Sequence, residues 1–287
     1  MQRRQWLVYA TSAMAGAPVA ARPAPATVAA PVQPAGRPGA LMLIGGAEDR
    51  QGDRLVLRRF VALCRGPAPR VVVLPSASAY PEAAARRYEA ALAALGVGQQ
   101  VVVHPASREE AGSLELVAQV ATADGVLITG GDQRRLTEIV GGTPLAQAIH
   151  QAFMNGACVA GTSAGAAVMS ARMLWARSLT EGFGLLPQVI VDQHFTERRR
   201  LPRLLRALSR YPDHVGVGVD EDTALVLRRG QGAEVVGSGS VTIVDPRAVQ
   251  GAIEGLEPDA LMQVPGLRVL RLQGQGAVDP QVARLLG

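Results

Sequence analysis

Lysine is absent from this chain of 287 residues, and aromatic residues make up only 3% of it. All 29 basic residues are therefore arginines, and they are scattered along the sequence. A nucleic-acid-binding protein usually offers stacking aromatics beside clustered basic residues, so the formal charge of +5 does not indicate nucleic acid as the partner. The positive charge instead favours anionic or carboxylate-bearing substrates. No run of 18 or more apolar residues is present, which argues against a membrane span.

Cysteine is scarce, and the four histidines show no metal-ligand spacing. Cys64 and Cys158 each lie inside an apolar run, which predicts small core residues and no disulfide. The histidines form neither an HxxxH pair nor a Cys/His ligand set. We therefore predict no metal and no other cofactor.

The first 39 residues differ in composition from the rest. The stretch 21–38 is rich in Pro and Ala, cannot bury a core, and is typical of a disordered linker. The preceding residues resemble a twin-arginine export signal, with Arg3 and Arg4, the bulky pair Trp6-Leu7 and a weakly apolar stretch. A disordered extension or a misplaced start codon accounts for this segment about as well, and export is slightly favoured over a cytoplasmic location. We expect one catalytic domain over residues 40–287.

From Ala40 onward, short apolar runs alternate with amphipathic segments. Continuous apolar runs over 41–44, 70–74, 100–103, 125–129 and 157–160 predict strands buried on both faces. Segments 53–64, 81–95, 108–122 and 144–155 have helical length and spacing. This alternation predicts an α/β fold: a doubly wound, mostly parallel sheet with helices on both faces. The sequence after about Val215 predicts further strands at one edge of the sheet and a short helix over 280–286.

Ser163 is the candidate nucleophile. It stands in Gly161-Thr-Ser-Ala-Gly165, between a predicted strand and a helix expected over 166–173. Such a strand-to-helix turn exposes the hydroxyl at the rim of the sheet and directs the amide of Ala164 at a developing oxyanion. A glycine-rich packing turn or a phosphate-binding loop is the alternative; the flanking elements favour catalysis.

A serine nucleophile needs an imidazole and a carboxylate. His194 lies in Asp192-Gln-His-Phe195, at the end of an apolar run, whereas the other three histidines lack this polar strand-end setting. The run Asp220-Glu221-Asp222 follows another predicted strand, and we expect one of its acids to point into the site. The resulting order of serine, histidine and acid disfavours an α/β-hydrolase, whose acid precedes its histidine.

Together these residues resemble the cyanophycinases, serine peptidases related in fold to class I glutamine amidotransferases. The resemblance runs from about Leu41 to Asp245 through five motifs in the family's order: 44–49, 130–133, 161–166, 192–195 and 218–225. It implies the flavodoxin-like fold of that superfamily and a homodimer. A glutamine amidotransferase itself is disfavoured, because serine stands where its cysteine would be.

The resemblance also implies residue roles. Ser163 would be the nucleophile, His194 the general base and Glu221 the orienting acid. The Gly131–Asp132 backbone, assigned to Asp132, would join Ala164 in the oxyanion hole. Substrate-binding positions would be Gln133, Asp192, Gln193, Arg198, Arg200 and Arg203.

The implied activity is that of a serine-type exopeptidase. It would hydrolyse cyanophycin, multi-L-arginyl-poly-L-aspartate, to β-Asp-Arg dipeptides through an acyl-serine intermediate. Each polymer unit presents a free carboxylate, which suits arginine forks, and a guanidinium, which suits acids such as Asp192. Two departures touch the rim of the substrate site: Arg199 and Pro202 stand where the family usually has glycines, and the segment 172–188 is short.

Two other functions remain open. An aspartyl dipeptidase of the same family would act on short β-aspartyl or N-terminal aspartyl peptides. A non-catalytic carboxylate-binding protein would use the same fold without chemistry. The segment Asp192–Phe195, with three arginines close behind it, favours cyanophycinase over the first, and the intact set of Ser163, His194 and Glu221 disfavours the second.

Overall fold

The valine- and leucine-rich runs form the centre of an eight-stranded sheet in the computed structural model, which describes residues 37–176, 178–274 and 276–286. Strand order is β14-β11-β10-β1-β5-β4-β2-β3. The neighbours from β1 to β3 are parallel and the remaining pairs antiparallel. The strands are β1 (Ala40–Ile44), β2 (Arg70–Leu74), β3 (Gln99–Val102), β4 (Gly125–Ile128), β5 (Cys158–Thr162), β10 (Thr223–Arg228), β11 (Gly232–Gly237) and β14 (Gly276–Ala277).

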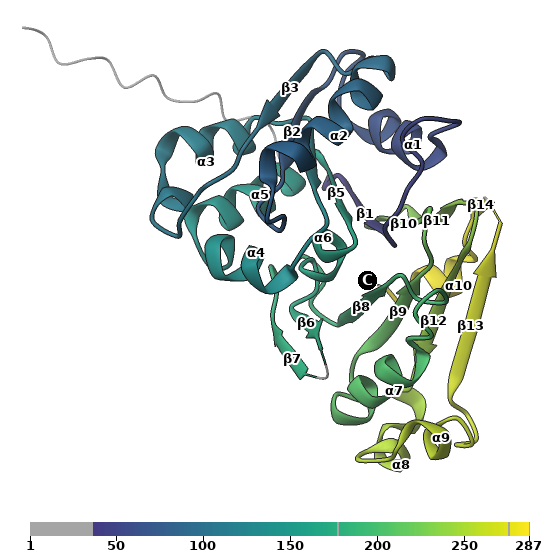
Figure 1. Ribbon diagram of the computed structural model, residues 1–287. Helices are drawn as coiled ribbons and strands as arrows, with labels where there is room; N and C mark the ends of the chain where they lie inside the picture. The colour runs from purple at the N-terminus through teal and green to yellow at the C-terminus, as the bar shows by residue number, and fades with distance from the viewer. Residues whose placement is uncertain (1–36, 177, 275, 287) are drawn as a thin grey trace, which may run out of the picture. The chain divides into compact units, whose positions relative to one another are not determined.

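Helices cover both faces of this sheet, as the sequence predicted. One apolar cluster joins α1 (Leu55–Leu63) and α2 (Pro81–Ala94) to one face of the central strands. A second cluster joins α3 (Leu114–Ala121), α4 (Gln133–Val140) and α5 (Pro144–Met154) to the other face. Figure 1 shows these helices wrapped around the parallel strands. Burial of each large side chain, such as Phe60 of α1, contributes about 1.5–3 kcal/mol to folding.

The C-terminal strands do not all lie at one edge, which corrects the prediction from sequence. β10, β11 and β14 extend the first sheet, while β8 (Val189–Gln193), β9 (Val215–Val219), β12 (Ser240–Asp245) and β13 (Arg268–Gln273) form a second sheet. α7 (Leu201–Arg210), α8 (Gln250–Ile253) and α9 (Pro258–Leu261) gather beside it through a third apolar cluster (Figure 1). Which sheet a strand joins depends on long-range pairing, which apolar periodicity does not encode.

Three predicted helices differ from the structure. The segment 108–122 is divided into a 3₁₀ turn, η1 (Glu110–Gly112), and α3. The helix expected over 166–173 is only α6 (Ala164–Ala167), and the chain continues into a hairpin of β6 (Arg172–Trp175) and β7 (Ser178–Glu181). The predicted last helix is shorter, α10 (Pro280–Ala283), and a second 3₁₀ turn, η2, spans Arg247–Val249.

Both cysteines are buried and free, which confirms them as core residues. Across the part of the chain that the structure describes, no helix combines the length and apolar character needed to cross a membrane. The export-signal-like segment and its linker lie almost wholly outside the described residues, and the division at residue 39 stays a prediction.

Candidate active site

Ser163 occupies a strained turn between β5 and α6. Its backbone has φ 52° and ψ −113°, a region that side-chain-bearing residues rarely adopt. The turn closes because its neighbours are small: a Cβ added to Gly161 would lie 2.1 Å from the carbonyl oxygen of Gly165. The amide of Ser163 donates to the carbonyl of Ile44 over 2.9 Å, which holds the turn against the end of β1. The expected strand–turn–helix setting is present, although α6 is a single turn and adds little dipole of its own.

Ser163, His194 and Glu221 form one hydrogen-bonded chain. The Oγ of Ser163 lies 2.8 Å from Nε2 of His194, and Nδ1 of that imidazole lies 2.5 Å from Oε1 of Glu221. A carboxylate only accepts hydrogen bonds, so Nδ1 carries the proton and Nε2 is free to accept from the serine. His194 is only 8% exposed, whereas the carboxylate of Glu221 is partly exposed. This arrangement is that of a nucleophile, a general base and an orienting acid.

Three successive carbonyls at the end of β1 hold these residues in register. The carbonyl of Ile44 accepts from the amide of Ser163, and that of Gly45 accepts from the amide of His194 over 2.8 Å. The carbonyl of Gly46 accepts from the amide of Asp222, next to Glu221, also over 2.8 Å. The Gly45–Gly46 turn therefore acts as a backbone template that aligns segments from β5, β8 and β9.

The three adjacent acids Asp220, Glu221 and Asp222 have different partners in the structure, which shows which of them contacts the imidazole. Asp220 is buried, and its carboxylate accepts from the amide of Thr196 and from both the amide and hydroxyl of Ser240. Asp222 accepts from the amide of Asp49 and from the hydroxyl of Ser238. Only the middle acid, Glu221, reaches the imidazole. The two flanking acids fix the loops on either side of it.

The oxyanion donors differ from the expectation in one residue. The amide of Asp132 donates to the carbonyl of Ala77 over 2.9 Å, so it is occupied, and the side chain of Asp132 caps α4 through the amide of Arg134. Asp132 is thus not an available donor, which corrects the prediction. Among the residues that the structure describes, the amides of Ala164 and Gly131 have no hydrogen-bond acceptor. Gly130, the neighbour of Gly131, packs against Ser163, since a Cβ on it would lie 3.2 Å from Cβ of the serine.

Four of the expected substrate contacts form an internal ion-pair cluster instead. Asp192 is fully buried, and its carboxylate accepts from Nη1 of Arg200 over 3.0 Å and from Nε of Arg203 over 2.9 Å, with a second, shorter contact to Nη2 of Arg203. Gln193 is also buried, and Arg200 donates to both its backbone carbonyl and its side-chain oxygen. Burial lowers the pKa of the Arg200 guanidinium, and the neighbouring Asp192 opposes that shift.

This cluster corrects the proposed role of Asp192. A carboxylate with no exposed surface and two arginine partners does not meet a substrate guanidinium. Sequence reasoning missed this because the partners lie eight and eleven residues further along the chain, at the start of α7. The cluster ties α7 to β8, two residues before His194.

The other two predicted contacts are more accessible. Gln133, the first residue of α4, donates from Nε2 to the carbonyl of Leu174 over 2.9 Å, which leaves its oxygen free of any partner in the described chain. Arg198 is exposed and forms no ion pair among the residues described. Both remain candidates for substrate contact.

A pocket of about 220 Å³ opens at the nucleophile and includes residues that sequence reasoning had not assigned. Glu48 lines it together with Ser163 and His194, although its side chain is almost wholly buried. The Glu48 carboxylate accepts from the hydroxyls of Tyr88 and Thr162, each over 2.6 Å. Burial, and next the negative charge of Glu48, raise the pKa of Tyr88 well above its usual range. The signal was present in Gly45-Gly-Ala-Glu48, but the distant partners of Glu48 become visible only in the fold.

The pocket also carries positive charge. Arg50 and Arg87 line it, and Nη1 of Arg50 lies 3.2 Å from the carboxylate of Glu48. The space beside Ser163 therefore offers guanidinium donors to a carboxylate-bearing ligand.

Comparisons with known proteins identify the family of this chain. Residues 41–235 match the model of Peptidase family S51. The chain belongs to peptidase family S51. It is 40% identical over 229 residues to a cyanophycinase from Synechococcus elongatus, an alignment that covers 76% of this chain and 71% of that protein. It is also 40% identical over 219 residues to a cyanophycinase from Trichormus variabilis, which covers 72% and 74%.

Two solved peptidase structures show a similar fold. A peptidase from an acI-B1 Actinobacterium superposes with a TM-score of 0.64 at 26% identity, covering 84% of this chain and 97% of its own. A putative peptidase E from Listeria monocytogenes EGD-e gives 0.50 at 16% identity, covering 69% and 98%, and supports the fold alone. The predicted class, a serine-type peptidase on a glutamine amidotransferase-like fold, is thus confirmed.

Proposed function

We propose that this S51 peptidase is a cyanophycinase, which cleaves the poly-aspartate backbone of cyanophycin and releases β-Asp-Arg dipeptides. The observation that carries the proposal is the continuous hydrogen-bonded chain from Ser163 through His194 to Glu221, within a sequence 40% identical to curated cyanophycinases. Homologues with that name, aligned over most of both chains, support the same substrate class.

The distances support a two-step acyl transfer. Nε2 of His194 accepts the proton of Ser163 while Oγ attacks the scissile carbonyl, and the imidazolium that forms is stabilised by Glu221. The imidazolium then protonates the leaving amine. Water, deprotonated by the same imidazole, attacks the acyl-serine and regenerates the enzyme.

The free amides of Ala164 and Gly131 are the oxyanion donors in this proposal. Each belongs to a turn next to Ser163 and has no acceptor in the described chain, so each retains a donor for the developing negative charge. This assignment replaces Asp132 by its neighbour. Since these donors are backbone groups fixed by β5 and by the turn after β4, they need no reorganisation during the reaction.

Substrate contacts at the scissile unit are assigned to the accessible residues. Arg198 and Arg87 offer forks to the free carboxylate, and Gln133 offers its side-chain oxygen to a substrate N–H. Asp192, Gln193, Arg200 and Arg203 are assigned a supporting role: their cluster fixes the segment that carries His194. The family resemblance further supports a homodimer, which sedimentation of the full chain tests.

The experiment is incubation of the full chain with insoluble cyanophycin, with clearing of the suspension and released products followed by mass spectrometry. Wild type should release β-Asp-Arg. Ser163→Ala should lose on the order of a thousandfold or more in kcat, while Ser113→Ala, a hydroxyl on the distant α3 side, should match wild type. Hydrolysis of α-aspartyl dipeptides without release from the polymer would contradict the proposal and point to an aspartyl dipeptidase.

A further inference from the structure

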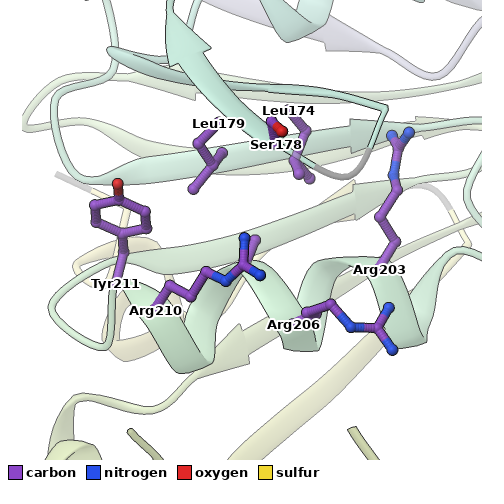
Figure 2. Close-up of a pocket in the computed structure, with 8 residues that line it drawn as sticks. Leu174, Ser178, Leu179, Arg203, Arg206, Arg210 and Tyr211 are labelled. Atoms are coloured by element: carbon purple, nitrogen blue, oxygen red, sulfur yellow. The ribbon is translucent and has the colours of Figure 1, made fainter. Parts of the chain in front are cut away.

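A second pocket, of about 260 Å³, lies between the β6–β7 hairpin and helix α7. Its lining comes from both elements: Leu174, Ser178, Leu179, Arg203, Arg206, Ala207, Arg210 and Tyr211. Figure 2 shows the side chains of Arg203 and Arg210 extending from the helix toward the hairpin that carries Leu174, Ser178 and Leu179, whereas that of Arg206 runs along the helix. The spacing of the arginines at 203, 206 and 210 is the helical repeat that places side chains on one face.

The arginines that line this pocket differ in whether a carboxylate neutralises them. Arg203 is bound to the buried Asp192. Arg206 pairs only with Glu257, whose carboxylate is 77% exposed, so water weakens that pair. Arg210 is exposed and has no ion-pair partner within the described chain. A fourth guanidinium, that of Arg172, lies 4.4 Å from the centre of the Tyr211 ring at the end of the pocket. The pocket thus has a positive excess that suits anions.

Both walls of the pocket connect to the active site. The carbonyl of Leu174, in β6, accepts from Gln133, which lies two residues after Gly131, an oxyanion donor in the proposed function. On the other side, Arg203 holds Asp192, two residues before His194. A substrate chain that left the nucleophile between Gln133 and α7 would follow these two connections toward Arg206 and Arg210.

We propose that this pocket is a remote subsite that binds free carboxylates of the polymer several units from the scissile bond. The proposal rests on the proposed function, since it assigns the pocket to the same repeating substrate. Along α7, Arg206 and Arg210 are separated by about 6 Å of helix rise. Substituents on one side of an extended backbone recur at about 7 Å, a spacing close to that of the two backbone positions that carry Arg206 and Arg210.

The remaining lining fits the rest of each unit. Leu174, Leu179 and Ala207 offer apolar surface to the methylene groups of the substrate's arginyl arms. In this proposal the exposed carboxylate of Glu257, which pairs with Arg206, meets a substrate guanidinium. The pocket thus complements both charges of the repeating unit, whereas a simple dipeptide would not reach it.

The test compares chain lengths in the full-length protein. kcat/KM is measured for soluble (β-Asp-Arg) oligomers of two and of ten units with wild type and with the double variant Arg206→Gln/Arg210→Gln. The ratio of kcat/KM on ten units to that on two units should fall about tenfold in the double variant, through KM, and the fall should shrink as salt is raised. Arg268→Gln/Arg284→Gln removes the same charge from two exposed arginines elsewhere and should leave the ratio at the wild-type value.

A binding measurement keeps the subsite distinct from the reaction. The wild-type background, the Arg206/Arg210 double variant and the control variant each also carry Ser163→Ala, so that none of them cleaves the ligand. Fluorescence anisotropy then gives the Kd of each protein for a labelled ten-unit oligomer. We expect the Kd to rise about tenfold when Arg206 and Arg210 are both replaced by Gln and to stay unchanged when Arg268 and Arg284 are replaced. This result would support the subsite without any turnover. An unchanged Kd and an unchanged length ratio would overturn it, including in a protein that degrades cyanophycin. Failure of wild type to release dipeptide would instead overturn the proposed function.

Discussion

The imidazole of His194 packs directly on the backbone of Gly46. A Cβ added to Gly46 would lie 2.3 Å from Cε1 and 2.6 Å from Nε2 of the ring, and Gly46 has φ +106°. Only glycine leaves room for the ring that faces Ser163. The same glycine accepts the amide of Asp222 through its carbonyl, so one residue contacts the base and fixes the segment that carries the acid.

Gly46→Ala should reduce kcat about a hundredfold, because the added methyl displaces the imidazole from Ser163 by a fraction of an ångström or more. Steady-state hydrolysis of a soluble β-Asp-Arg oligomer measures the loss. Gly96→Ala is the matched control: it also has a positive φ, of +85°, but nothing lies within 4 Å of its added Cβ. Equal losses in the two variants would show that backbone strain, and not displacement of His194, is responsible.

Glu221→Gln should lower kcat by about a hundredfold or more with little change in the melting temperature. The neutral amide no longer selects the productive tautomer of His194 and no longer stabilises its positive charge. Asp222→Asn keeps an acceptor for the Asp49 amide and serves as the control with the same loss of charge. If Asp222→Asn lost as much activity as Glu221→Gln, the assignment of the orienting acid to Glu221 would fail.

Asp192→Ala should reduce the free energy of unfolding by about 3 kcal/mol, because it leaves two largely buried guanidinium groups without their carboxylate. Urea denaturation followed by circular dichroism gives this value. Glu257→Gln breaks an exposed pair with Arg206 and should cost less than about 1 kcal/mol. A variant of Asp192 that was fully stable but had a raised KM would restore the substrate contact predicted from sequence.

We expect the loop before α1 to lose stability at low pH, when Asp49 becomes protonated. The amides of Arg54, Gly52 and Gln51 donate to its carboxylate and lower its pKa from 3.8 to about 2. Because the folded-state pKa is the lower one, the stabilisation is present above about pH 4 and disappears as the pH falls toward 2. The difference in stability between wild type and Asp49→Ala should therefore narrow over that interval, as measured by urea denaturation at successive pH values. A difference that did not change with pH would assign the effect to lost packing.

Local sequence patterns specified the parallel α/β core and pointed to Ser163 and His194, and the family resemblance selected Glu221 from three adjacent acids. Apolar runs that end in glycine or polar residues specify strands buried on both faces, and the glycines around Ser163 specify a turn that larger residues could not form. These are local properties. Each of the three residues follows a strand, but Ser163 follows β5 of the first sheet whereas His194 and Glu221 follow β8 and β9 of the second, so the packing of the two sheets brings them together.

Tertiary structure alone decided which polar groups remained available. Whether Asp192 faces a substrate or two internal arginines, and whether the amide of Asp132 is free or bound to Ala77, depends on partners that no local pattern reveals. The same holds for the division of the C-terminal strands between two sheets and for the hairpin that faces α7. The residue type shows which hydrogen bonds and ion pairs a side chain can form. Whether those bonds are already made to other parts of the protein depends on the packed neighbours, because a buried polar group must find its partner inside the fold.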